Sequence, residues 1–204
     1  MALTKGERTR SRIVERCAPV FNQRGYARAS MRDLVAAAGL EKGGLYNHFD
    51  SKEALALASL DHSVSLLGAR LAAARGSTDD AGDQLVAVVR AFAQWARKPA
   101  VPGGCPIMNT AIEADDTNGE LRAHARDAMT RWHRLIGAIV KDGSAAGQLD
   151  PSTDPYGLAT VMTSALEGAL MLSRLHDDVS HMDRVVDHLV AHIETLRTRE
   201  AVRR

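Results

Sequence analysis

The stretch from Lys42 to His48 carries side chains that could contact the bases of a nucleic acid. Its polar residues and glycines are Lys42, Gly43, Gly44, Tyr46, Asn47 and His48, whereas Leu45 and the following Phe49 are apolar. Asparagine is suited to the hydrogen-bonding edge of adenine, and glycines let a backbone approach a ligand closely. The stretch therefore predicts a short helix whose apolar side packs inward and whose polar side contacts DNA.

Two short helices separated by a glycine turn would position this stretch. The first is expected to begin at Ser30, with Asp33 three residues later as in a capping box, and to end at Gly39. The second is expected over about Glu41–His48. Short helices joined by a tight turn that contains glycine are the core of a helix-turn-helix, a motif that binds DNA.

Basic charge is concentrated at the N-terminal end of the chain. Residues 1–52 contain ten lysines and arginines against five acidic residues, a net charge of +5, so the rest carries −4 within the overall +1. A basic head on a mildly acidic body favours a polyanionic partner that the head contacts. Ordinary surface charge is the alternative reading of the composition alone.

The sequence SMRDLVAAAGLEKGGLYNHFDSKEAL at 30–55, with VFNQRGYARAS leading into it, closely resembles the DNA-binding signature of the TetR family of repressors. The resemblance covers roughly residues 8–56, and the segment GGCPIMNTAIEADD at 103–116 is similar to one branch of that family. It implies an N-terminal three-helix DNA-binding domain and a C-terminal helical domain that binds a small-molecule effector and dimerises.

The resemblance also implies roles by position. The implied phosphate contacts are Ser30, Tyr46, His48 and Lys52, and helix starts such as those at Ser30 and Lys52 favour anions. The implied major-groove contacts are Lys42, Gly43, Gly44 and Asn47, while Arg8, Arg10 and Arg12 would follow the DNA backbone or the minor groove. Alternatively, Tyr46 and Phe49 lie in the core of the small domain and His48 on a solvated face.

Helical patterns recur along the whole chain without a convincing strand, so the predicted fold class is all-α with about nine helices. The first, over about Thr4–Gln23, is expected to bend at Pro19 and to stop at Gly25. The other helices are expected at about 51–75, 80–97, 106–114, 117–147, 154–175 and 180–199, with start signals at Asp50 or Ser51, Thr117, Asp154 and Ser180. No linker interrupts the fourth helix, at whose start the predicted DNA-binding domain (1–52) gives way to the effector-binding and dimerisation domain (53–204).

Candidate effector contacts come from several helices of the second domain. They are Phe92, Trp95, Met108, Trp132, Met162 and Met171. Methionine and aromatic side chains can line an adaptable apolar pocket, and packing in an ordinary core is the alternative. Glu167 lies in an otherwise apolar helix, where it would meet a cationic ligand or an arginine across a dimer interface.

Cys105 and a histidine pair offer other triggers. Cys105 precedes Pro106 at a predicted helix start, which favours its thiolate and a response to oxidants or electrophiles, and an inert, partly buried cysteine is the alternative. His188 and His192 lie one turn apart, as metal ligands can. No third ligand is evident, so a solvated helix face is the alternative.

Other classes of protein lack support. No apolar run approaches the ~20 residues that span a bilayer, and no apolar stretch follows the basic start as in a signal peptide. No nucleophile with a base, phosphate loop or complete metal site indicates an enzyme or a cofactor. We therefore expect a cytoplasmic DNA-binding repressor with no cofactor and no membrane contact.

A homodimer is expected to form through the helices at about 155–175 and 181–199. A charge at Leu166 or Leu189 is expected to break it, because association would bury an unpaired ion. Two heads about 34–36 Å apart would meet successive major grooves of a palindromic operator. An effector would shift the dimer away from that spacing and release the DNA.

Overall fold

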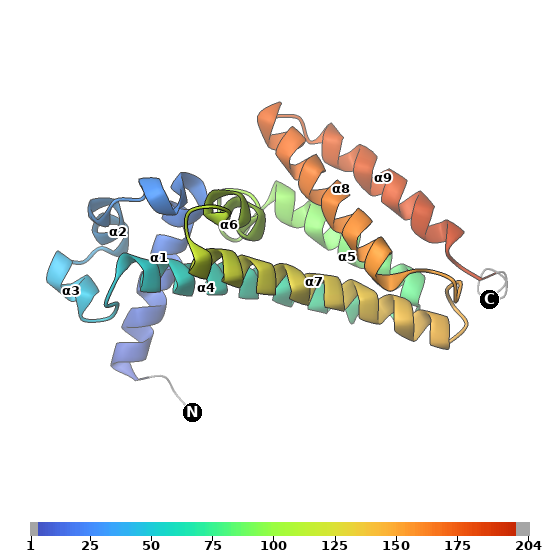
Figure 1. Ribbon diagram of the computed structural model, residues 1–204, viewed down its shortest axis with the longest axis horizontal. Helices are drawn as coiled ribbons and strands as arrows, with labels where there is room; N and C mark the ends of the chain where they lie inside the picture. Colours follow the sequence, from blue (N-terminus) through green and yellow to red (C-terminus); the bar gives the residue numbers. More distant parts are fainter. Residues whose placement is uncertain (1–3, 199–204) are drawn as a thin grey trace. The chain divides into compact units, whose positions relative to one another are not determined.

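The computed structural model describes residues 4–198, which form helices joined by turns and loops (Figure 1). The helices are α1 (Lys5–Arg28), α2 (Met31–Ala38), α3 (Lys42–Tyr46), α4 (Lys52–Arg75), α5 (Ala81–Arg97), α6 (Pro106–Ala114), α7 (Gly119–Ala145), α8 (Pro155–Leu175) and α9 (Ser180–Thr195). The predicted all-α fold with about nine helices is confirmed. Residues 1–3 of the predicted first domain and 199–204 of the second, including the last position of the predicted final helix, lie outside the described residues.

The chain divides into two compact units. Of the described residues, the first unit comprises 4–66 together with Ala100–Ala128, and the second comprises Leu67–Pro99 together with 129–198. Helices α4 and α7 contribute to both units, in agreement with the expectation that no linker follows the helix-turn-helix. The segment Ala100–Ala128 groups with the N-terminal helices, although the sequence assigned it to the second domain. The domain boundary at residue 52 stays a prediction.

Side-chain caps set the starts of the N-terminal helices. Thr4 forms a capping box at α1, and Ser30 forms the predicted one with Asp33 at α2. At α4, the Ser51 hydroxyl oxygen accepts a hydrogen bond from a backbone N–H at 3.0 Å. Each cap satisfies N–H groups that have no partner within their own helix. Gly39 then ends α2 as predicted, with a φ of 66°.

At the end of α1 the break predicted at Gly25 is confirmed, whereas the predicted end at Gln23 and the role given to Pro19 are not. The helix backbone leaves helical geometry at Gly25 (φ 79°, ψ 164°) and not at Pro19, and a last turn then extends the helix to Arg28. Pro19 removes one backbone hydrogen bond but keeps the helical φ that its ring already imposes. Gly25 adopts a φ that residues with a side chain disfavour, so it is the residue that redirects the chain.

Two further helix starts use different caps from those predicted. The side-chain oxygen of Asn118 caps α7 by accepting from two backbone N–H groups at 2.9 and 3.0 Å. The hydroxyl of Thr117, the predicted cap, instead donates to the carbonyl of Glu113 at 2.6 Å. At α9 the carboxylate of Asp178 accepts from the N–H and the hydroxyl of Ser180, so Ser180 is the first helical residue and not the cap. The cap predicted at Asp154 is confirmed.

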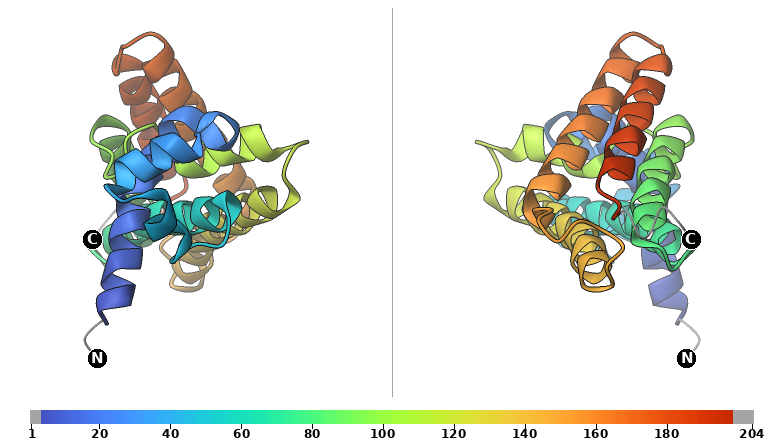
Figure 2. Two further views of the ribbon diagram at one scale, coloured as in Figure 1. Left: turned by 90° about the vertical axis from the view of Figure 1, so that its left-hand side faces the viewer. Right: turned by 90° about the vertical axis from the view of Figure 1, so that its right-hand side faces the viewer.

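Each unit has its own apolar core. That of the first unit joins the first four helices through Ile13, Val14, Cys17, Leu34, Ala38, Leu45, Phe49 and Leu55. In the second unit α5 packs against α8 and α9, and the last two helices lie side by side (Figure 2, right). The rings of Phe92 on α5 and Trp132 on α7 stack there with centroids 5.0 Å apart.

Candidate nucleic-acid interface and a cavity in the first unit

Helix α3 is the candidate recognition helix, and apolar residues fix its orientation. Leu45 and Phe49 expose only 1% and 2% of their surfaces, because both lie in the core of the first unit. The residues exposed around them are Lys42, Gly43, Asn47 and Tyr46, the last at 41%. Phe49 is therefore a core residue and Tyr46 is not, which leaves the Tyr46 side chain available to a partner.

The glycine pair at the start of α3 leaves room beside the backbone. A Cβ atom added at Gly43 would meet no atom within 4 Å, and one added at Gly44 would meet only the side chain of Leu40 at 3.7–4.0 Å. Neither glycine has a positive φ. The fold therefore requires a glycine at neither position, and close approach of another molecule is a physical reason for both.

Two arginines of α1 brace the helix-turn-helix. The Arg10 guanidinium donates to the carbonyl of His48 at 2.6 Å and lies 3.9 Å from the centroid of the Phe49 ring, a cation–π contact. Arg16 donates to the carbonyl of Ala38 at 3.1 Å, at the end of α2. Arg10, predicted to follow DNA, therefore also holds the turn after α3. Exposed on the same helix are Arg8 and Arg12.

Ser30 and Lys52 already have partners within the chain. The Ser30 hydroxyl donates to the carboxylate of Asp33 at 2.7 Å, and this bond, followed by one from the Ser30 N–H, holds the pKa of Asp33 below its usual value. The Lys52 ammonium donates to the carbonyl of Ala27 at 3.4 Å and lies 4.5 Å from the centroid of the Tyr26 ring. Their roles as phosphate contacts stay predictions, and each would share its polar group with these partners.

The residues predicted to contact an effector fall in both units. Cys105 and Met108 belong to the first, and Phe92, Trp95, Trp132, Met162, Glu167 and Met171 to the second. Phe92, Trp95 and Met162 expose at most 1% of their surfaces. Trp132 exposes 4%, whereas Met171 exposes 52% and lies outside the packed interior. The four residues that expose 4% or less are core residues in this structure, as the alternative interpretation predicted. An effector role for them stays a prediction.

The remaining candidate residues are a cysteine, two histidines and a glutamate. Cys105 is fully buried, more so than the partly buried cysteine of the alternative, and its role as a trigger stays a prediction. His188 and His192 are both exposed on α9, and no group of three or more potential metal ligands occurs within residues 4–198. Glu167 exposes 7% of its surface on α8.

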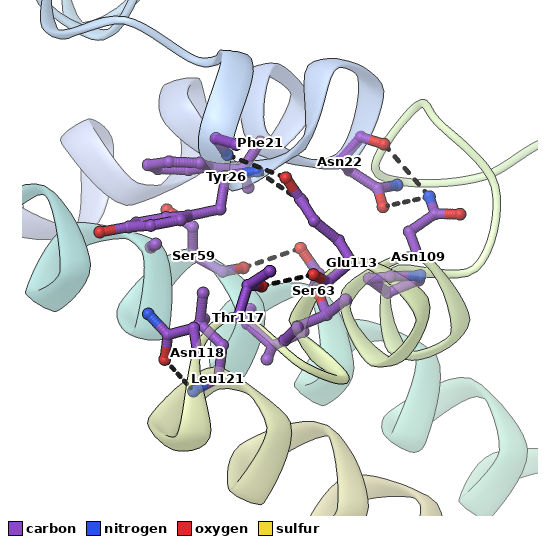
Figure 3. Close-up of a pocket in the computed structure, with 17 residues that line it drawn as sticks. Phe21, Asn22, Tyr26, Ser59, Ser63, Asn109, Glu113, Thr117, Asn118 and Leu121 are labelled. Atoms are coloured by element: carbon purple, nitrogen blue, oxygen red, sulfur yellow. Dashed lines mark hydrogen bonds between the residues drawn. The ribbon is translucent and has the colours of Figure 1, made fainter.

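A cavity of about 230 Å³ lies in the first unit between α1, α4, α6 and the start of α7 (Figure 3). The polar residues that line it are Asn22, Tyr26, Ser59, Ser63, Asn109, Thr110, Glu113, Thr117 and Asn118. The larger apolar ones are Phe21, Leu60 and Leu121. None of the residues predicted as effector contacts lines it. The sequence feature that could have located this cavity is the segment 103–116, which supplies Pro106, Asn109, Thr110, Glu113 and Ala114 to its lining.

Two polar side chains of α6 join it to the end of α1. The carboxylate of Glu113 accepts hydrogen bonds from the N–H groups of Tyr26 and Ala27 at 2.7 and 2.8 Å. The amide of Asn109 donates to the backbone and side-chain oxygens of Asn22 at 3.1 and 2.9 Å (Figure 3). These five residues are called the α1–α6 contact below. It ties α1, which packs against the first helix of the helix-turn-helix, to the wall of the cavity.

The fold and the exposed face of α3 are those of a helix-turn-helix DNA-binding regulator. The family model for bacterial regulatory proteins of the tetR family matches residues 13–59, and the model for the tetracyclin repressor-like C-terminal domain matches residues 81–189. The chain belongs to the TetR family of transcriptional regulators. It is therefore a DNA-binding regulator and not an enzyme. No helix within residues 4–198 is long and apolar enough to cross a membrane.

Solved structures and curated relatives agree with this assignment. A TetR transcriptional regulator from Chloroflexus aurantiacus is 38% identical with a TM-score of 0.91, over 96% of this chain and 98% of that one. A TetR-family regulator from Cytophaga hutchinsonii is 32% identical with a TM-score of 0.89, over 98% of this chain and all of that one. The HTH-type transcriptional repressor DhaR of Mycobacterium sp. strain GP1 is 25% identical over 86% of this chain and 87% of that protein.

Proposed function

We propose that this regulator is a repressor that binds a palindromic operator as a homodimer in the cytoplasm and is released by a small-molecule effector. The observation that carries the proposal is the orientation of α3. Its buried Leu45 anchors the helix, and Lys42, Tyr46 and Asn47 remain exposed on the other side. Such side chains at a helix surface can reach base edges and phosphates in the major groove. Repression is proposed because the relative DhaR is named a repressor.

The dimer is proposed to form through α8 and α9. The exposed large apolar residues of α8 and the turn after it are Tyr156, Val161, Met171, Leu172, Leu175 and Val179. Exposed apolar side chains gathered on one element mark a protein contact. Leu166 and Leu189, which the sequence analysis placed in the interface, expose 0% and 1% within a single chain. Both belong to the core of the single chain. A charge at either position would therefore disturb the fold, so these residues are the wrong ones for a test of the dimer interface.

A mobility-shift assay with the DNA upstream of the chain's own gene tests the proposal. We expect a shifted complex that an excess of unrelated DNA displaces only weakly. The affinity should fall steeply as the salt concentration rises, because phosphate contacts release counterions. Lys42→Ala is expected to weaken the complex strongly. Lys141→Ala, which removes an exposed lysine of α7 instead, is the matched control. Equal affinity of the wild-type protein for upstream and unrelated DNA would contradict operator recognition.

A further inference from the structure

We propose that the cavity of the first unit binds a neutral, largely apolar molecule with one hydroxyl or carbonyl group, and that its occupation weakens DNA binding. The binding half of this proposal stands on the cavity alone. The regulatory half rests on the proposed function, because it needs an operator from which the protein is released.

The size of the cavity sets the size of the ligand. Apolar cavities of about 150 Å³ hold a benzene-sized molecule. The cavity here has about 230 Å³, which leaves room for a second fused ring. Phe21, Leu60 and Leu121 supply apolar surface from three different helices, and several alanines complete the lining. A ligand without apolar surface would gain little from entering such a site.

The charge of the lining excludes anions. Glu113 is the one charged residue among the described residues that line the cavity. Its two carboxylate oxygens already accept hydrogen bonds from the N–H groups of Tyr26 and Ala27. An anion would therefore meet a carboxylate and no lysine or arginine among the lining residues, and the two negative charges would repel each other. A neutral molecule avoids this cost.

Ser59 supplies the reason for one polar group on the ligand. It lines the cavity, exposes 1% of its surface, and its hydroxyl oxygen has no hydrogen-bond partner within residues 4–198. A buried hydroxyl without a partner is costly, and a ligand that supplies a hydroxyl or carbonyl removes that cost. Neighbouring hydroxyls are already engaged, since Ser63 donates to the carbonyl of Ser59 at 2.8 Å and Thr117 to that of Glu113 at 2.6 Å.

The α1–α6 contact connects occupation of the cavity to the DNA-binding helices. Glu113 and Asn109 form part of the cavity wall and also hold the end of α1. The approach is close at Gly25, where an added Cβ would lie 2.6 Å from the Glu113 carboxylate. A ligand that moves α6 must therefore move or break these bonds. Because α1 packs against α2, the change reaches the helix-turn-helix.

Titration calorimetry with β-naphthol, and with naphthalene as the same ring system without a hydroxyl, tests the binding half without DNA. Wild-type protein is expected to bind both probes at one site, β-naphthol more tightly. Ser59→Ala is expected to weaken β-naphthol by about fivefold, the effect of one net hydrogen bond, and to leave naphthalene unchanged. Because Ser59→Ala removes a buried hydroxyl without a partner, the free variant should melt no lower than the wild type.

Filling the cavity locates the site. Ser63→Leu places a larger side chain at the lining from α4 and is expected to abolish binding of both probes, while Ser65→Leu, on an exposed position of the same helix, is expected to change neither. Thr110→Leu fills the cavity from α6 and replaces Ser63→Leu if that variant unfolds on a thermal melt. The proposal is overturned if neither probe binds at about 1 mM, or if binding survives in a folded filling variant.

The regulatory half is measured separately on the operator complex. Saturating β-naphthol is expected to weaken operator binding by wild-type protein at least tenfold, and to have no effect on the folded filling variant. Calorimetric binding without any change in operator affinity would overturn the regulatory half alone. Absence of operator binding in the unliganded protein would instead contradict the proposed function and leave the calorimetric result standing.

Discussion

Gly43→Ala separates the needs of the fold from those of DNA recognition. A Cβ at this position would meet no atom within 4 Å, so the substitution is sterically neutral in the free protein. Alanine is favoured over glycine in a helix by up to about 1 kcal/mol, and by less near a helix end, so the midpoint of thermal unfolding should stay or rise. A loss of DNA affinity in this variant cannot then be ascribed to unfolding.

The expected loss follows from the contact that the glycine would make. If the start of α3 lies against the DNA, the added methyl must displace one surface from the other. Insertion of a methyl into a close-packed contact costs about 1–3 kcal/mol, which corresponds to a loss of about 5- to 150-fold in affinity. A helix that stands further from the DNA would lose nothing.

Fluorescence anisotropy of a labelled operator fragment, at a fixed salt concentration, measures the dissociation constant. Gly68→Ala is the matched control, because a Cβ added there in the exposed middle of α4 also meets no atom within 4 Å. We expect Gly68→Ala to bind as the wild type does. Wild-type affinity in Gly43→Ala would refute the close approach of α3 to the DNA. An equal loss of affinity in Gly43→Ala and Gly68→Ala would show that the effect is not specific to the start of α3.

Three further predictions concern the rest of the fold. Arg197→Met should lower the free energy of unfolding in urea by about 2 kcal/mol, because the guanidinium pairs with Asp80 and Asp83 and only 12% of the arginine side chain is exposed. An unchanged urea midpoint would show that these pairs contribute nothing to stability. Burial raises the pKa of the Cys17 thiol to about 11, so iodoacetamide should label this cysteine only slowly in the folded protein at neutral pH. The free energy of unfolding should fall as pH rises from the ordinary thiol pKa towards 11, because the unfolded state then loses the thiol proton first. Rapid labelling of Cys17 in the folded protein would contradict this. Leu175→Glu should give a folded monomer in sedimentation, because this side chain is 71% exposed in a single chain, and a dimer of unchanged affinity would place the interface elsewhere.

Local sequence signals predicted the helices well because each acts over a few residues. The Ser30 capping box, Gly39 and Asp154 fix helix ends through hydrogen bonds or dihedral angles that the neighbouring sequence already specifies. The apolar side of α3 was also predictable, since Leu45 and Phe49 lie four residues apart and one turn of helix brings them to the same side.

Features that depend on long-range packing were not predictable in the same way. The cap of α7 was missed for a local reason instead, because the hydroxyl of Thr117 donates to the carbonyl of Glu113 four residues earlier and leaves the cap to Asn118. In the strongly apolar α8, periodicity alone does not distinguish Leu166, which faces the core, from Leu175, which is exposed.

The cavity was missed for a related reason. Its walls come from segments as far apart as Phe21 and Leu121, and polar residues such as Asn22 and Ser59 stand among the apolar ones. Large methionine and aromatic residues were instead predicted to line a pocket, but Phe92 and Trp132 pack against each other in the core. Large apolar side chains fill interiors as well as line pockets, so their type alone does not locate a cavity.

Selection of bound duplexes from a randomised library tests the central claim most directly. The purified protein should enrich one palindromic sequence whose half-site centres lie about one helical turn of DNA apart, or a multiple of it. Asn47→Ala should change the bases preferred within each half-site and keep the spacing, because the side chain is exposed beside α3 and the spacing belongs to the dimer. Recovery of no preferred sequence, or of an unchanged one with Asn47→Ala, would contradict recognition of DNA bases through this face of the helix-turn-helix.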